Sequence, residues 1–318
     1  LTINGGTLSL SNTYSEPGGY IIMNNATING NTNGQILATS GWIGNGNNTI
    51  NHQLSMENNK GWTTGLFDIQ SGTTTINSVV YNYLNRTQGI TKNGTGALVL
   101  NGANTFNGSS TLNAGTLVLN NNTALGLQSF TIVSGTLDNT SGGSITLTNN
   151  NTQSWNGDFT FIGTNDLNIG TGAVTMNASR TITVSAGNFT TVGGAIGGAT
   201  FGLTKNGSGT MILTGANTYT GTTTVNAGTL SIGAADRIAD TSNLNVAGGT
   251  FNLGGYNETL GSITGSGNIT LGAGTLTTNS TSNTTFSGLI TGTGGLTKAG
   301  SSTLTLSGNN TYNGTTTI

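Results

Sequence analysis

Charged residues, proline and histidine are scarce in this sequence, and cysteine is absent. The 318 residues include 7 Lys or Arg, 9 Asp or Glu, one Pro and one His, which gives a net charge of -2. Without Cys there is no disulfide and no thiolate metal site. So few cations argue against a nucleic-acid partner, because nucleic-acid binding needs a basic surface. No apolar run is long enough to span a bilayer, so we expect no membrane insertion by this segment.

Three residue types instead make up about half of the chain: 54 Gly, 63 Thr and 46 Asn. All three are poor helix formers, which argues against a helical fold. Hydrophobic residues still account for 33% of the chain, and they are regularly placed. This combination predicts an all-β protein with a buried core rather than a disordered linker.

One long segment occurs three times, starting at Gly89, Gly202 and Gly295, and each copy opens with Gly, Ile or Leu, Thr and Lys. The three lysines of this opening, Lys92, Lys205 and Lys298, lie several coils apart. The copies are therefore landmarks in a longer array and not neighbouring turns. We interpret the lysines as solvated corner residues that bond backbone carbonyls.

A shorter period lies within this array, because the triplet of Gly, Thr and an apolar residue recurs at a nearly constant step. Within each step, apolar and polar residues alternate, as they do in a half-buried strand. This spacing predicts a parallel β-helix of about 20 residues per coil. An antiparallel sandwich or barrel is the alternative, but neither requires a constant step. The predicted internal column comprises Leu98, Leu117 and Leu137, and we expect Met211, Leu230 and Phe251 to continue it.

The repeats predict one continuous β-solenoid over residues 1–318, with less regular coils over residues 11–88, where the alternation is less clean. The chain begins and ends inside the repeat, since residues 1–8 match the tail of a copy and Ile318 corresponds to Ile3. We therefore expect a segment of a longer repeat array. Subunits that stack end to end, each completing its neighbour's coil, are the alternative.

The second copy, residues 202–221, carries the opening Gly-Leu-Thr-Lys and the later turn Asn-Thr-Tyr. It resembles the autotransporter-associated β-strand repeat, also called the passenger-associated transport repeat. The resemblance covers the two full copies and the partial third copy. It implies a secreted bacterial surface protein whose passenger is a right-handed β-helix, and a role as an adhesin, a stalk or a biofilm component.

The ionisable residues give little support to catalysis. Carboxylate pairs of the kind that cleave glycosides could come from Asp158 with Asp166, or from Asp236 with Asp240. We interpret both pairs as turn or loop residues that contact local backbone or Arg groups. His52 has no nucleophile motif around it, and we expect it at the surface. The sequence therefore predicts no enzyme, no catalytic residues, no metal site and no cofactor.

Aromatic residues are the better candidates for ligand contact, because they concentrate in residues 1–88. The four candidates are Trp42, Trp62, Tyr81 and Tyr83. A core-filling role for these rings is the alternative.

We predict a non-catalytic extracellular stalk or fibre at the bacterial cell surface that supports adhesion, aggregation or biofilm matrix. Possible partners are surface glycans, proteins or other copies of the chain. The alternatives are a self-assembling filament subunit and a carbohydrate-active β-helix enzyme.

Overall fold

The computed structural model describes residues 1–10, 14–16, 19–30, 36–38, 41–56, 64–82, 87–186 and 189–318. The chain divides into two compact units. Unit 1 comprises Leu1–Phe159 and Thr164–Gly170, and unit 2 comprises Thr160–Gly163 and Thr171–Ile318. A single continuous solenoid over the whole chain stays a prediction. Among the described residues, no helix has the length and apolar character needed to cross a membrane.

Unit 1 is built from short strands in three main sheets. The first contains β1 (Thr2–Asn4), β4 (Tyr20–Asn24), β7 (Gly41–Asn45), β10 (Thr64–Ile69), β13 (Gly89–Asn93), β15 (Ser110–Leu112), β17 (Phe130–Ile132) and β20 (Gln153–Trp155). The second contains β2 (Thr7–Leu10), β5 (Thr27–Gly30), β8 (Asn48–Ile50), β11 (Thr73–Ile76), β14 (Ala97–Leu100), β16 (Thr116–Leu119) and β18 (Gly135–Asp138). The third contains β3 (Tyr14–Glu16), β6 (Ile36–Ala38), β9 (Leu54–Met56) and β12 (Val80–Asn82), and β19 (Ile145–Thr146) pairs separately with β22 (Leu167–Asn168).

Unit 2 also has three main sheets. The first contains β24 (Arg180–Val184), β27 (Leu203–Asn206), β29 (Thr223–Val225), β31 (Leu244–Val246), β34 (Ile263–Gly265), β37 (Thr284–Phe286) and β40 (Leu304–Leu306). The second contains β25 (Phe189–Val192), β28 (Thr210–Leu213), β30 (Thr229–Ile232), β32 (Thr250–Asn252), β35 (Asn268–Thr270) and β38 (Leu289–Thr291). The third contains β33 (Glu258–Leu260), β36 (Leu276–Thr278), β39 (Leu296–Lys298) and β41 (Thr316–Thr317). Two further strands, β23 (Val174–Met176) and β26 (Ile196–Gly197), pair with each other, and β21 (Phe159–Phe161) spans the boundary between the units.

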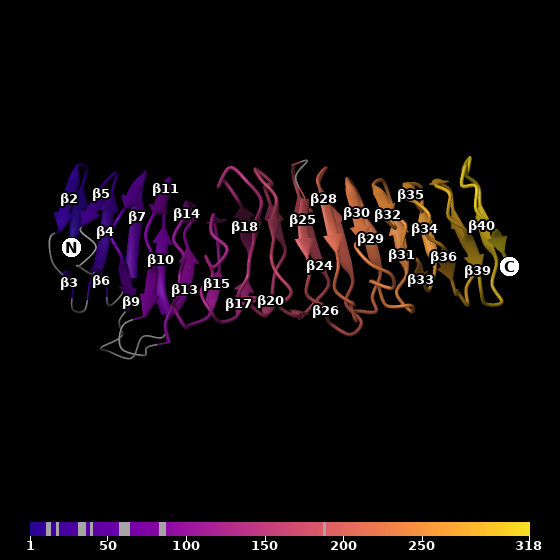
Figure 1. Ribbon diagram of the computed structural model, residues 1–318, viewed down its shortest axis with the longest axis horizontal. Coiled ribbons are helices and arrows are strands. Elements are labelled where there is room, and N and C mark those ends of the chain that lie inside the picture. The colour runs from indigo at the N-terminus through magenta and orange to yellow at the C-terminus, as the bar shows by residue number, and fades with distance from the viewer. Residues whose placement is uncertain are drawn as a thin grey trace. The chain divides into compact units, whose positions relative to one another are not determined.

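These strands confirm the predicted parallel β-solenoid. Within each unit, neighbouring strands of a sheet come from successive turns and run parallel, as β14, β16 and β18 do (Figure 1). Leu98 pairs with Leu117, and Leu117 pairs with Leu137, so these turns keep the step that the sequence shows. The average is roughly 21 residues per turn. Because each turn pairs only with its neighbours, stability is distributed along the array.

Several early turns of unit 1 are longer than the sequence period predicts. In the second sheet, Ile28 pairs with Ile50, Ile50 with Ile76, and Ile76 with Leu100. The next pair in this series joins Leu100 to Leu119 and restores the shorter step. All five side chains are at most 1% exposed, so extra residues lengthen the corners and leave the apolar column intact.

The six predicted column residues are all buried, but they form two columns in different sheets. Leu98, Leu117 and Leu137 stack in the second sheet of unit 1, each at most 1% exposed. In unit 2, Met211 pairs with Leu230 on β28 and β30, and Leu230 pairs with Phe251 on β32. The expectation that the second set continues the first is wrong. The first copy of the repeat starts on β13 and the second on β27, and these two strands belong to different sheets. The same residues of the repeat therefore lie in different sheets in the two copies.

Asparagine stabilises the corners through ladders of side-chain amides. At the ends of successive strands of the second sheet of unit 1, each Asn Nδ2 donates to the Oδ1 of the Asn one turn earlier. The donor–acceptor distances are 2.8, 2.7, 2.6 and 2.8 Å along the series Asn29, Asn51, Asn77, Asn101 and Asn120. Stacked amides of this kind satisfy one another between identical positions, which accounts for part of the high Asn content.

Glycine is required where a corner turns tightly against the preceding turn. Gly207 has φ +78°, a region that side chains rarely adopt. A Cβ atom there would lie 2.2 Å from the carbonyl oxygen of Val184. Close approach of successive turns therefore selects Gly at this corner.

Candidate functional site

The aromatic residues predicted to contact a ligand do not form a surface patch in the described residues. Trp42 is 5% exposed and stacks on Phe67 of the adjacent strand, with ring centroids 6.3 Å apart and planes at 4°. Trp42 therefore fills the interior, and its predicted role as a surface contact is wrong. The reason is the alternation of β7, which directs this ring inward. Tyr81 is half-buried on β12, whereas Trp62 and Tyr83 lie outside the described residues.

The ionisable residues considered for chemistry do not assemble into a metal site. No group of three or more His, Cys, Asp or Glu in the described part of the chain could hold a metal ion. Asp236 lies in a corner with φ +53°, and its backbone N–H donates to the Asn257 carbonyl oxygen. Ser144 donates to Asp166 at 3.4 Å. Both contacts join successive turns and not neighbouring residues, so neither is the local backbone or Arg contact that the sequence predicts.

His52 lies in the interior and not at the surface, where the sequence predicts it. Its side chain is 1% exposed, and its ring nitrogens make no hydrogen bond. Burial lowers the pKa of His52. A Cβ on Gly30 would lie 2.3 Å from His52 Cδ2, so the ring packs directly on the backbone of the preceding turn. The imidazole is a packed core side chain here.

The lysine position of the repeat holds a buried ammonium group in the first copy. Lys92 is 0% exposed, and its Nζ donates to the carbonyl oxygens of Asn93 at 2.6 Å, Gly94 at 2.9 Å and Ala114 at 3.1 Å. Two of these carbonyls belong to its own corner and one to the next turn. Burial lowers the pKa of Lys92 to about 8, although the negative charge of Asp68 opposes the change.

The second copy repeats this geometry. Lys205 is also 0% exposed, and its three acceptors are the carbonyl oxygens of Asn206 at 2.8 Å, Gly207 at 2.9 Å and Ala227 at 3.3 Å. Burial lowers the pKa of Lys205 to about 8 as well. Lys298 donates only to Ala299 and to Gly300, the latter at 3.2 Å. The predicted bonds to backbone carbonyls are therefore present, but Lys92 and Lys205 are buried and not solvated.

Sequence reasoning missed one buried carboxylate, Glu258. It is 1% exposed, and its two oxygens accept the backbone N–H groups of Arg237 and Ile238, each at 2.8 Å. Burial raises the pKa of Glu258 to about 7, while the two N–H donors act in the opposite direction. Glu258 begins a strand in which Thr259 is half-buried and Leu260 is buried. Side chains alternate between two faces along a strand, so Glu258 lies on the same inward face as Leu260, and this alternation was the sequence signal for its burial. The carboxylate fixes the irregular corner of residues 233–243 against the next turn.

That corner forms one wall of a polar groove in unit 2, with a volume of about 540 Å³. Most of its lining lies in the three corners that precede β31, β34 and β37. The lining residues are Asp240, Thr241, Asn243, Gly261, Ser262, Asn279, Ser280, Thr281 and Ser282, together with Thr284, the first residue of β37. The middle corner has only Gly261 and Ser262 between β33 and β34. The corners on either side are longer, since residues 233–243 separate β30 from β31 and residues 279–283 separate β36 from β37. A short corner between two long ones therefore hollows the surface.

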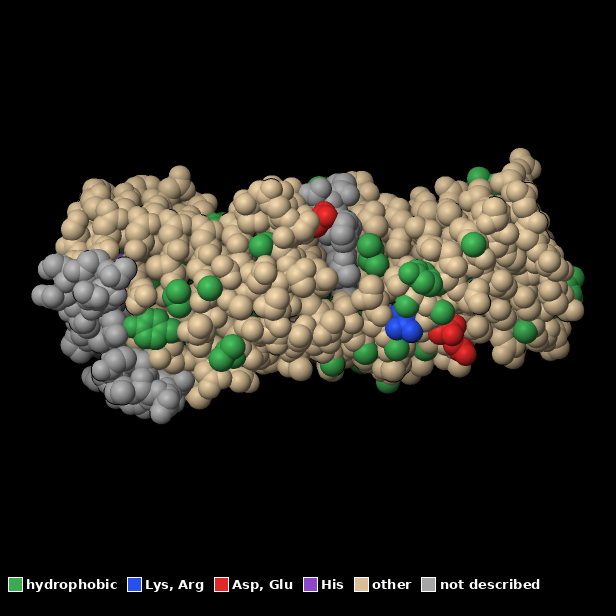
Figure 2. All heavy atoms as spheres, in the orientation of Figure 1, with side chains coloured by type: hydrophobic (Ala, Val, Ile, Leu, Met, Phe, Trp, Pro, Cys, Tyr) green, Lys and Arg blue, Asp and Glu red, His purple; other side chains and the backbone are tan. Residues whose placement is uncertain are grey.

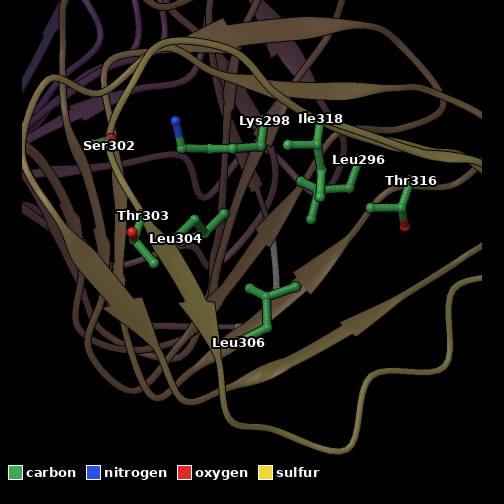
Figure 3. Close-up of a pocket in the computed structure, with 8 residues that line it drawn as sticks. All are labelled: Leu296, Lys298, Ser302, Thr303, Leu304, Leu306, Thr316 and Ile318. Atoms are coloured by element: carbon green, nitrogen blue, oxygen red, sulfur yellow. The ribbon is translucent and has the colours of Figure 1, made fainter.

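A second, more apolar pocket of about 420 Å³ lies at the last strands of unit 2. The side chains of Leu296, Leu304, Leu306 and Ile318 face a common space beside Lys298 (Figure 3). Leu304 and Leu306 on β40 are partly exposed, whereas Leu98 and Leu100 at the same motif positions are buried between two neighbouring strands. This pocket is the open side of a terminal turn.

Outside these features, the side of the molecule in view is polar and almost uncharged, with few acidic or basic side chains (Figure 2). Hydroxyl, amide and backbone groups make up most of that surface. A surface of this kind favours hydrogen bonding over electrostatic attraction.

Comparison with known proteins agrees with the repeat pattern. A family model described as the passenger-associated-transport-repeat matches residues 90–119, 203–232 and 296–318. The chain carries passenger-associated transport repeats. In the first two repeats, the matched residues comprise the buried Lys and the strands that surround it.

A curated relative of this repeat protein is the Adhesin BmaC autotransporter of Brucella suis biovar 1. The two are 33% identical in an alignment 312 residues long, which covers 90% of this chain and 8% of the relative. The chain thus spans less than a tenth of that relative's length. No solved structure matches the chain.

Proposed function

We propose that this chain is part of the passenger of an autotransporter-type adhesin, is exported to the bacterial surface, and serves there as a non-catalytic scaffold. The observation that carries the proposal is the occurrence of three passenger-associated transport repeats within a parallel β-solenoid. The similarity to an autotransporter named as an adhesin supports the same assignment.

The physical properties of the chain suit a load-bearing surface segment. Every described turn is hydrogen-bonded to its neighbours by parallel pairing, so stability does not depend on one central core. The absence of Cys makes folding independent of the redox state outside the cell. Ionisable side chains are few in the described residues, and three buried ones, Lys92, Lys205 and Glu258, bond backbone groups instead of facing a cleft.

The proposal is tested by displaying residues 1–318 on a non-adherent bacterium through an unrelated surface anchor. We expect the displaying cells to attach to host-cell or abiotic surfaces, or to aggregate, more than cells that display the anchor alone. Equal attachment and aggregation of both strains would contradict an adhesive role. Release of reducing sugar from polysaccharides by the purified chain would contradict the non-catalytic assignment and favour a β-helix enzyme.

A further inference from the structure

We propose that the polar groove of unit 2 is a binding site for a neutral saccharide. One wall of the groove consists of Asp240, Thr241 and Asn243, and the floor consists of Gly261 and Ser262. The other wall consists of Asn279, Ser280, Thr281, Ser282 and Thr284. Its volume of about 540 Å³ lies within the range of small-ligand sites. This inference goes beyond the scaffold role and does not require it, since binding is measured on the purified chain.

The floor of the groove is rigid and leaves no space for a side chain on the glycine. A Cβ on Gly261 would lie 2.8 Å from Asn243 Oδ1 and 3.0 Å from the Thr241 carbonyl oxygen. Ser262 Oγ donates to the same Asn243 Oδ1 at 2.7 Å, and Gly261 N–H donates to the Ser242 carbonyl at 2.9 Å. Asn243 and Ser262 thus hold adjacent corners together, and the recess is preformed.

The walls also present polar groups that the fold does not use. The side chains of Asp240, Thr241, Asn279, Thr281 and Ser282 are exposed at the two walls and have no hydrogen-bond partner in the described part of the chain. The set therefore combines hydroxyl groups, one amide and one carboxylate. Such groups bind sugar hydroxyls as both donors and acceptors.

The composition of the lining excludes other ligand classes. No Lys or Arg lines the groove, and Asp240 contributes a negative charge, so phosphates, sulfated or sialylated glycans and nucleic acids are disfavoured. A divalent cation is disfavoured because Asp240 is the sole carboxylate in the lining. Large apolar ligands lack a surface to contact, since no aromatic or aliphatic side chain lines the recess. A neutral, polyhydroxylated molecule is the class that remains.

The experiment starts with a glycan array probed with the purified 318-residue chain, followed by titration calorimetry and saturation-transfer NMR with the neutral oligosaccharides that bind. Lactose, maltotriose, cellotriose and N-acetylchitotriose are titrated in every case, and sialyllactose is the acidic comparison. We expect saturable binding of at least one neutral saccharide and none of sialyllactose. The absence of binding by every neutral saccharide, or a preference for sialyllactose, would overturn the proposal.

Two sets of matched variants locate the site. We expect Thr241→Trp and Thr281→Trp, on opposite walls, each to weaken binding at least tenfold because the indole fills the recess. Ser301→Trp places the same ring on the exposed corner of the following turn, outside the groove, and we expect it to bind like the wild type. Unchanged binding in both wall variants, or equal loss in Ser301→Trp, would refute the assignment. Circular dichroism confirms that each variant is folded.

The role of the Asp240 carboxylate is tested by substitutions within its own corner, residues 233–243. We expect Asp240→Asn to weaken binding about threefold or more, because Asp240 is the strongest acceptor in the lining. Asp236→Asn is the matched control, since Asp236 belongs to the same corner but lies outside the lining, and Asn tolerates its positive φ. An equal effect of both substitutions would show that net charge, and not the groove, determines binding.

Discussion

Replacing Lys205 by Met removes the buried ammonium group while keeping a side chain of similar length. In the native structure, the Nζ atom of Lys205 occupies the interior of a corner and donates to three carbonyl oxygens, those of Asn206, Gly207 and Ala227. Two of these carbonyls belong to the corner itself, and the third belongs to the next turn. The lysine therefore joins consecutive turns at the repeat's most distinctive position.

Two opposing effects determine how much Lys205→Met changes the free energy of unfolding. Hydrogen bonds from a charged donor contribute about 1.5–3 kcal/mol each, and Met leaves all three carbonyls without this donor. Removal of the buried charge recovers its desolvation cost, which is about 3–4 kcal/mol because burial lowers the pKa of Lys205 from 10.5 to about 8. The hydrogen-bond loss exceeds this gain. We expect Lys205→Met to lower the free energy of unfolding by about 2–4 kcal/mol.

The measurement combines urea unfolding with amide hydrogen exchange, since a solenoid opens locally and the loss should concentrate in residues 203–232. Lys298→Met is the control: Lys298 is more exposed and donates to two carbonyls, so its replacement should cost less than about 1 kcal/mol. If Lys205→Met were as stable as the wild type or more stable, desolvation would outweigh the hydrogen bonds, and the reasoning would be wrong.

Three further predictions concern pH, corners and ladders. The folded pKa of Lys92 and of Lys205 is about 8 and the unfolded value is 10.5, so the unfolded chain binds more protons than the folded chain between these pH values. The free energy of unfolding in urea titrations should therefore rise from pH 8 to 10.5, by at most about 3–4 kcal/mol per lysine, and a double Lys→Met variant should lack this rise. Gly207→Ala should cost more than about 2 kcal/mol in the same assay because its Cβ meets a backbone oxygen at 2.2 Å, whereas Gly5→Ala, with φ +66° and nothing within 4 Å, should cost about 1 kcal/mol. Asn77→Ala interrupts the ladder at two bonds of 2.7 and 2.6 Å and should cost about 1–2 kcal/mol by urea unfolding; a change below about 0.3 kcal/mol would show that the ladder is not stabilising.

The sequence alone determined the fold class and much of the local register. The nearly constant steps that link Leu98, Leu117 and Leu137 are visible in the sequence, and the same residues pair in the structure. Alternation and a constant step carry this information because side chains in a strand alternate between two faces and stacked turns repeat the same inward positions. The family resemblance was likewise present in residues 202–221.

The tertiary structure decided where each motif lies on its turn and what each corner contributes. The longer turns of unit 1, from Ile50 to Ile76 and from Ile76 to Leu100, keep their column because corners absorb the extra residues. Sequence periodicity does not show how many residues a corner holds. The Met211 column lies in a different sheet from the Leu98 column, and the sequence period alone does not show this either.

Burial was the other property decided only in three dimensions. Trp42, His52 and Lys92 carry polar atoms, and the sequence predicts them at the surface, yet all three are buried. Trp42 and Lys92 point inward from their strands, and His52 packs on Gly30 of the preceding turn. The groove of unit 2 also depends on neighbours: Gly261 and Ser262 are an ordinary short corner in the sequence, and they form a recess because the corners one turn before and after are longer. Residues one turn apart in the chain become adjacent only when the turns stack, so a site built across turns has no local sequence signature.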